Sequence, residues 1–164
     1  MIPLDDLEDY FDDLTISYSQ CQIDELYSVF KKDFIDNPFE VDGLKVKVIL
    51  EYASGTEFDS YPETFAHLIT RKSGTGKRVF DPFRANKLHW IKSILLQHAY
   101  KQIKYFEYKE SDGRVRDYYW YEEKDFIVIM EKITPDYLII TSFHIDDNIS
   151  RKRYEKRYWK YKRC

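Results

Sequence analysis

Three side chains that can handle a proton and a phosphate recur four residues apart, at Glu63, His67 and Arg71. If one helix spans them they share a face, because side chains four residues apart are neighbours on a helix. The imidazole would then transfer a proton and the guanidinium would hold a phosphate. An ordinary surface charge pair beside a half-buried histidine has the same spacing, so the pattern leaves both interpretations open.

A second polar group, Thr141, Ser142 and His144, ends the last strand that the sequence predicts. Strand alternation puts Thr141 on one face and Ser142 and His144 on the other. Polar side chains at the end of an apolar strand predict a site at the rim of a sheet, and fraying of the strand into solvent is the alternative. Thr141 and His144 can serve one site only if a bulge or the strand end lies between them.

The glycine-rich segment 72–78 predicts a mobile basic loop that carries Lys72, Lys77 and Arg78. It is not a phosphate-binding P-loop, because Arg71 stands where that motif needs its first glycine. Arg78 also follows the lysine where the motif needs serine or threonine. The loop can still contact phosphates through its three basic side chains.

The acidic residues after His144 do not predict a metal site. Hard divalent cations gather three or more oxygen donors, and no second acidic cluster is placed to join Asp146 and Asp147. We interpret these two aspartates as the turn and cap before a terminal helix. No metal and no other cofactor is expected.

The elements that must position these residues follow from hydrophobic periodicity. Apolar residues at helical spacing predict amphipathic helices over 4–14 and 23–34, and alternation over 44–52 predicts a strand. Ser60 to Glu63 matches a capping box that would begin a short helix. Asp81-Pro82 predicts the start of a helix that reaches about residue 100.

From residue 103 the period changes from 3.6 to 2. Strands are predicted over 103–110 and 114–121, joined by Asp112-Gly113, and again over 126–133 and 137–145. A basic helix is expected over 151–163. The sequence thus predicts one α+β domain over 1–164, with N-terminal helices, an antiparallel meander and a basic C-terminal helix.

The formal net charge of −3 averages two opposed parts of the chain. Residues 1–64 hold 16 Asp and Glu against 4 Lys, and the remainder holds 13 against 22 Lys and Arg. Such asymmetry is typical of contact with a polyanion. The high aromatic content excludes a disordered chain. We expect no membrane span, no signal peptide and no disulfide framework, which indicates a cytoplasmic protein.

Several short motifs resemble one known family. They are the stretch 65–72, the segment 78–81 that follows the glycine-rich loop, Arg84, the stretch 89–91, and the strand 137–143. Together they resemble the phage and mobile-element branch of the barnase–EndoU–colicin–RelE-like (BECR) nuclease superfamily. The likeness covers residues 62–147, so that 1–61 becomes an acidic accessory segment and 148–164 a basic terminal helix.

The resemblance implies a four-stranded antiparallel sheet and a metal-independent endoribonuclease of toxin or phage-conflict type. The RNA 2′-hydroxyl would attack the adjacent phosphate. On matching positions His67 would be the acid–base group, Arg71 would hold the phosphate and Thr141 would donate a hydrogen bond to it. His144 has no counterpart in the family and is a second acid–base candidate from its position alone. The substrate contacts would come from Lys72, Lys77, Arg78, Arg84 and Ser142.

The implied partner is RNA, either tRNA or mRNA, and an immunity or antitoxin protein is a second candidate partner. A different class of function also fits the sequence. The chain could be a non-catalytic phage or mobile-element protein that binds RNA with its basic part or a protein with its acidic part. RNA binding that survives loss of His67, without cleavage, would favour this alternative.

Overall fold

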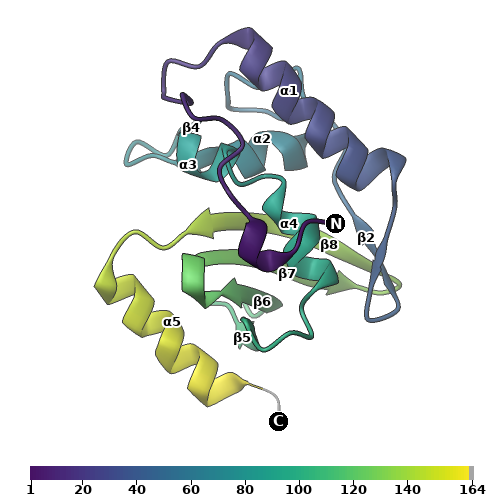
Figure 1. The fold of residues 1–164 in the computed structure, drawn as a ribbon, viewed down its shortest axis with the longest axis vertical. Coiled ribbons are helices and arrows are strands. Elements are labelled where there is room, and N and C mark those ends of the chain that lie inside the picture. The colour runs from purple at the N-terminus through teal and green to yellow at the C-terminus, as the bar shows by residue number, and fades with distance from the viewer. Residues whose placement is uncertain (163–164) are drawn as a thin grey trace.

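The centre of the fold is a six-stranded mixed sheet, seen here in a computed structural model that describes residues 1–162 (Figure 1). The strand order is β1-β2-β8-β7-β6-β5. The strands are β1 Glu40–Val41, β2 Leu44–Lys47, β5 Ile103–Lys109, β6 Val115–Tyr121, β7 Phe126–Ile133 and β8 Asp136–His144. All neighbours are antiparallel except β2 and β8, which are parallel. The predicted α+β class is confirmed.

The four strands expected from the sequence are only part of this sheet. β5 to β8 form the antiparallel meander, with the predicted turn at Asp112-Gly113. Gly113 has a φ of 89°, in the left-handed region that glycine adopts without strain. The number of strands was wrong because β2 adds to the edge of β8, where Val46 pairs with Tyr137 and both side chains are buried.

The two faces of the meander are buried by different elements. The face that carries Tyr119 and Val128 joins the main core, which includes α4 (Trp90–Leu96) and the N-terminal segment. The opposite face, with Trp120 and Ile127, packs against α5 (Asn148–Tyr161). The prediction of a central strand buried on both faces is confirmed for residues 126–130 of β7.

β8 contains an irregularity one residue before Thr141. Ile129 lies opposite Thr141 and Met130 opposite Ile139, so Ile140 is the extra residue. Thr141 therefore shares the face of Ile129, which belongs to the cluster under α5. The bulge does not fall between Thr141 and His144, so in regular strand geometry these two still point to opposite faces.

The segment 4–14, predicted as an amphipathic helix, forms only the single turn η1 (Leu4–Asp6). Aspartate is a weak helix former, and the backbone of this segment finds other partners. The Phe11 N–H donates to Asn86 Oδ1 at 2.7 Å, and the Tyr121 hydroxyl donates to the Leu4 carbonyl at 3.0 Å. Leu4 and Leu7 are buried. The acidic segment 1–61 thus contributes apolar side chains to the main core.

The second predicted helix is confirmed as α1 (Gln20–Lys31), which a π-helical turn, Lys32–Asp36, continues. Its Phe30 ring lies 5.4 Å from the Phe65 ring of α2 (Glu63–Ile69), between centroids. α2 begins after Pro62, and no side chain caps it. The predicted helix is therefore correct, whereas the predicted capping box is wrong.

The single helix predicted from residue 81 to about 100 is two helices, α3 (Pro82–Ala85) and α4. The Asp81 cap is confirmed, since its carboxylate accepts from the N–H groups of Phe83 and Arg84. The chain turns between the helices because the Asn86 side chain binds the N-terminal segment instead of facing solvent.

The outer edge of β8 beyond Leu138 has no neighbouring strand within residues 1–162, and α2 and α3 contact β8 there (Figure 1). Between these helices the chain forms the two-stranded hairpin of β3 (Thr70–Lys72) and β4 (Arg78–Phe80). The segment predicted as a basic loop is the turn of this hairpin. The hairpin and α3 thus bring basic side chains to the edge of the main sheet.

The terminal basic helix is confirmed as α5, and Asp147 caps it by accepting from the Ser150 N–H at 2.7 Å. The predicted end at residue 163 is wrong, because the helix ends at Tyr161 and Lys162 has an extended backbone; residues 163 and 164 lie outside the described residues. No helix in the described part of the chain is long and apolar enough to cross a membrane.

Candidate functional site

Glu63, His67 and Arg71 do not share one helix face. α2 ends at Ile69, and Thr70 has the extended backbone of β3, with φ −126° and ψ 163°. The Thr70 hydroxyl donates to the Ala66 carbonyl at 2.6 Å, which satisfies an acceptor at the end of the helix. Arg71 therefore lies on the β3–β4 hairpin, where it pairs with Val79, and the expected alignment is wrong.

Two arginines hold the C-terminal end of α2. Arg78 donates to the Thr70 hydroxyl and carbonyl, both at 2.9 Å, and to the His67 carbonyl at 3.3 Å. Arg84 donates to the same Thr70 carbonyl at 2.9 Å. Cations at this end of a helix are favourable, because its carbonyl groups carry partial negative charge. Both residues, predicted as substrate contacts, thus have a structural role as well.

His67 lies among positive charges. Burial lowers the pKa of its imidazole from 6.5 to about 4, and the neighbouring charges of Arg78, Arg84 and Arg116 add to this effect. His67 is therefore neutral at pH 7, so it can accept a proton but has none to give as a general acid. An anion bound to these arginines would reduce their effect and raise the pKa of His67.

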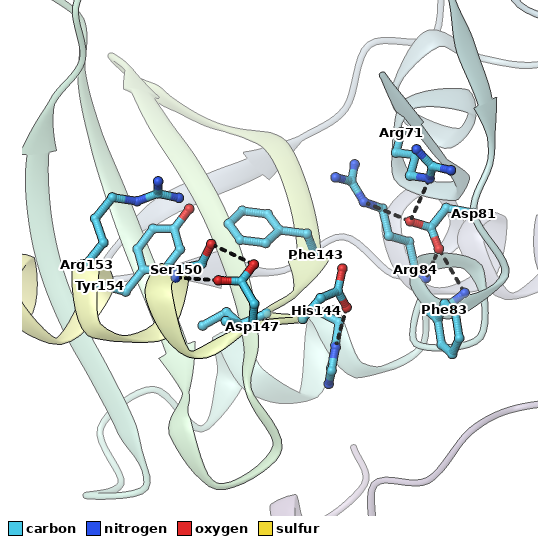
Figure 2. A pocket seen from close by; sticks show the side chains of 12 residues that line it. Arg71, Asp81, Phe83, Arg84, Phe143, His144, Asp147, Ser150, Arg153 and Tyr154 are labelled. Carbon is cyan, nitrogen blue, oxygen red and sulfur yellow. Dashed lines mark hydrogen bonds and ion pairs between the residues drawn. The ribbon is translucent and has the colours of Figure 1, made fainter. Parts of the chain in front are cut away.

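Asp81 lies beside the guanidinium groups of Arg71 and Arg84. Its Oδ1 caps α3, whereas its Oδ2 lies 3.6 Å from Arg84 Nε and 4.0 Å from Arg71 Nε. Figure 2 shows both arginine side chains beside this carboxylate, with the Arg84 guanidinium directed toward Phe143. The Arg84 Cζ lies 5.9 Å from the centroid of that ring. The side chain of Arg71 is 54% exposed, which leaves it free to meet a ligand.

These arginines line a pocket between the β8 end, the β3–β4 hairpin, α3 and the start of α5 (Figure 2). Its volume is about 250 Å³. Pockets that enclose drug-sized ligands span roughly 300–1,000 Å³, so this pocket suits one charged group of a larger ligand. Its polar lining is Arg71, Asp81, Arg84, His144, Asp146, Asp147, Ser150 and Arg153.

His144 enters this pocket as the last residue of β8. Its Nδ1 lies 3.0 Å from Asp146 Oδ1, so the carboxylate orients the imidazole and leaves Nε2 for another partner (Figure 2). Histidine with a carboxylate on one ring nitrogen is a common arrangement for proton transfer at the other. The structure thus brings together Arg71, Arg84 and His144 of the residues predicted from the sequence.

Thr141 and Ser142 do not line the pocket, and their hydroxyl groups are buried without a hydrogen-bond partner in the described residues. Ser142 is fully buried and lies opposite Val128, a residue of the main core. Thr141 lies on the α5 side of the sheet, two residues from Phe143. Neither hydroxyl is therefore placed to contact a ligand in the pocket.

The remaining predicted contacts lie away from the pocket. Lys72 and Lys77 are exposed on the β3–β4 hairpin, and no ion pair to a carboxylate is recorded for them in residues 1–162. His67 does not line the pocket either. The hairpin lysines remain candidates for contact with a long ligand only.

Sequence reasoning did not name as site residues several charged residues of the pocket, among them Arg153, Asp81 and Asp146, the last of which was interpreted as part of a turn. Arg153 was one basic residue among many in the terminal helix, and nothing in its spacing distinguished it. Asp81 was interpreted as a helix cap alone, although Arg84, three residues later, was a visible signal for an ion pair. Within residues 1–162, no three His, Cys, Asp or Glu side chains form a group that could hold a metal ion.

Comparison of the chain with protein-family models, with curated proteins and with solved structures finds no match. The likeness to the BECR nuclease superfamily therefore stays a prediction. A functional proposal for this chain depends on the geometry of the pocket and on the charges around it.

Proposed function

We propose that the protein is a metal-independent endoribonuclease whose active site is the pocket at the end of β8. One observation carries the proposal: two arginines fixed by Asp81 and an imidazole fixed by Asp146 line the same pocket. Guanidinium groups bind phosphate oxygens through parallel hydrogen bonds, and an oriented imidazole accepts a proton. These are two of the requirements for cleavage of RNA by its own 2′-hydroxyl.

In the proposed reaction Arg71 and Arg84 hold the scissile phosphate and stabilise the charge that develops on it. His144 Nε2 accepts the proton of the 2′-hydroxyl while the 2′-oxygen forms its bond to phosphorus. The bond from phosphorus to the 5′-oxygen breaks, and that oxygen takes a proton from water. The products are a 2′,3′-cyclic phosphate and a 5′-hydroxyl, and His144 returns its proton to solvent.

We assign the base to His144, although His67 was the first choice from the sequence. His67 does not line the pocket, and its side chain makes no recorded hydrogen bond that would orient the ring. Thr141 does not line the pocket and its hydroxyl is buried, so the proposed mechanism assigns it no contact with the phosphate.

The test is incubation of the purified protein in EDTA with tRNA, mRNA and a synthetic RNA. A matched oligonucleotide carries a 2′-O-methyl group at every ribose, so that only 2′-hydroxyl chemistry is removed. We expect cleavage of the RNA alone, with 2′,3′-cyclic phosphate ends. His144→Ala should lower the rate by about 10²-fold or more.

The matched control is His98→Ala. His98 also lies close to a carboxylate, 3.2 Å from Asp42, but it does not line the pocket. The control should leave cleavage unchanged. The proposal fails if the folded protein leaves all RNA intact, if it cuts the methylated oligonucleotide, or if both histidine variants behave alike.

A non-catalytic RNA-binding protein is the second candidate. The observation that favours it is that, among the described residues, the pocket lining contains a single imidazole and no second histidine that could act as the acid. This candidate predicts that the protein binds RNA without forming products and that His144→Ala leaves the binding affinity unchanged.

The toxin-type role of the proposed nuclease predicts that induced expression of the unchanged protein stops bacterial growth, whereas expression of His144→Ala does not.

A further inference from the structure

A second groove runs along α5 beside β5, and its charge is strongly one-sided. Its volume is about 650 Å³, which is enough for a nucleotide-sized group. The cationic side chains that line it all come from α5: Lys152, Arg153, Lys156, Arg157 and Lys160. Among the described residues, none with an acidic side chain lines the groove.

The positive charge of this groove is not compensated by ion pairs. None of its five cations lies within 4.0 Å of a carboxylate in the described part of the chain, whereas Arg151 on the same helix pairs with Asp125 and Glu155. Asp125 and Glu155 thus pair with Arg151 and form no ion pair with the cations of the groove. Such a surface attracts an anion with many charges.

Aromatic rings lie among the cations. The Arg157 guanidinium lies 3.8 Å from the centroid of the Tyr108 ring, and Tyr161 meets the same ring edge to face at 5.7 Å. All three residues line the groove. Guanidinium planes and aromatic rings are the surfaces on which unpaired nucleic-acid bases stack.

The apolar side of α5 is already used. Tyr154 is buried against Tyr118 and Phe143 of the sheet, and Lys162 at the helix end forms a β-bridge with Phe106 of β5. An amphipathic helix binds a membrane by inserting its apolar face. Since that face of α5 packs on the sheet, the described lining of the groove offers charge and aromatic rings and a single exposed aliphatic side chain, Ile149, which is less than the continuous apolar face that inserts into a lipid surface.

Arg153 lines both the groove and the pocket at the end of β8. A ligand that occupies both must be extended and anionic. Lys152, Lys156 and Lys160 repeat every four residues, which separates them by about 6 Å along the helix. This repeat is comparable to the distance between neighbouring phosphates of an extended single strand.

We infer that the α5 groove binds single-stranded RNA and guides it into the pocket. The lysine repeat contacts successive phosphates, while Arg157 and Tyr161 stack with bases. The choice of RNA over other single strands rests on the proposed function. The binding of an extended nucleic-acid strand by the groove does not depend on any cleavage step.

The test measures fluorescence anisotropy of a labelled, fully 2′-O-methylated 12-nucleotide RNA, which the protein cannot cut by the proposed chemistry. The variant is Lys152→Gln/Lys156→Gln/Lys160→Gln. The control is Lys45→Gln/Lys47→Gln/Lys101→Gln, which removes the same charge from exposed positions outside the groove. Urea unfolding of each variant verifies that the fold is retained.

Each phosphate contact contributes about 0.7 to the slope of log affinity against log salt for a single strand. The groove variant should therefore lower that slope by about 2 and weaken binding at least tenfold at low salt, while the control changes the slope little. The inference is overturned if both triple variants weaken binding equally. It is also overturned if an RNA duplex, polyglutamate or anionic phosphatidylglycerol vesicles bind the groove more tightly than the single strand.

The outcomes separate this inference from the proposed function. His144→Ala should bind the methylated RNA as tightly as the unchanged protein, because binding precedes chemistry. If the groove variant loses binding but no RNA is ever cut, the inference holds and the nuclease proposal fails. If RNA is cut while the groove variant binds and cleaves normally, the nuclease proposal holds and the inference fails.

Discussion

Replacement of His67 by glutamine should change how the stability of the protein depends on pH. The pKa of this imidazole is lowered from 6.5 to about 4 by burial and by the arginines around it. Between these two pH values the unfolded chain binds a proton at His67 and the folded chain does not. The unfolded state therefore gains stability as the pH falls, and the free energy of unfolding decreases.

The magnitude follows from the two pKa values. One pKa unit corresponds to 1.36 kcal/mol, so His67 alone should lower the free energy of unfolding by about 2 kcal/mol between pH 7 and pH 5. His67→Gln removes this contribution because glutamine does not titrate. The free energy of unfolding of the variant minus that of the unchanged protein should therefore be about 2 kcal/mol larger at pH 5 than at pH 7.

The assay is urea unfolding followed by tryptophan fluorescence at several pH values, since Trp90 and Trp120 are buried. A control for any general loss of stability is Thr64→Ala on the same helix, which removes the acceptor of the Ile49 N–H bond and no titrating group. Its stability should run parallel to that of the unchanged protein from pH 7 to pH 5. A constant difference between His67→Gln and the unchanged protein over this range would refute the reasoning.

Two further predictions concern carboxylates that organise their surroundings. Asp81→Ala should lower the free energy of unfolding by about 1 kcal/mol more than Asp81→Asn, because only asparagine keeps an acceptor for the first turn of α3; equal urea midpoints would contradict this. Tyr137→Phe should cost about 1–3 kcal/mol, since its hydroxyl binds both the buried Asp117 at 2.6 Å and the Tyr119 hydroxyl at 2.7 Å. A change below about 0.5 kcal/mol in the same assay would show that the network does not need this hydroxyl.

The sequence predicted best those elements whose signals are local. The hairpin at Asp112-Gly113, the apolar strand β7 and the Asp147 cap of α5 each depend on a few adjacent residues, and each is confirmed. The number of strands was wrong because the addition of β2 to β8 depends on residues about 90 positions apart, which no local pattern encodes.

The errors in helices have a common physical cause. In the segment 4–14 and in the predicted helix 81–100, apolar residues have helical spacing, but hydrogen bonds between the two segments interrupt the helical pattern, as where the Tyr10 N–H donates to the Asn86 carbonyl at 3.0 Å. Asn86 interrupts one helix and binds Phe11 of the other segment with both ends of its amide. Tertiary partners of this kind override local propensity.

For the site, residue types were more informative than spacing. Arg71, Arg84 and His144 were all named from the sequence and share one pocket, yet the helical alignment that suggested Arg71 does not exist. His67 was named for its position between Glu63 and Arg71, and its actual surroundings are arginines from other elements. A sequence indicates which groups can bind phosphate, whereas the chain path decides which of them meet.

The N-terminal segment has a consequence for the order in which the chain acquires its structure during synthesis. The Leu4 carbonyl accepts from Tyr121 and the Leu7 carbonyl from Lys124, both 117 residues later, and Trp90 donates to the Glu8 carbonyl. The backbone of residues 4–8 is therefore synthesised long before the side chains that bind it. Docking of this segment on the core thus depends on the prior synthesis of α4 and of the β6–β7 end of the sheet.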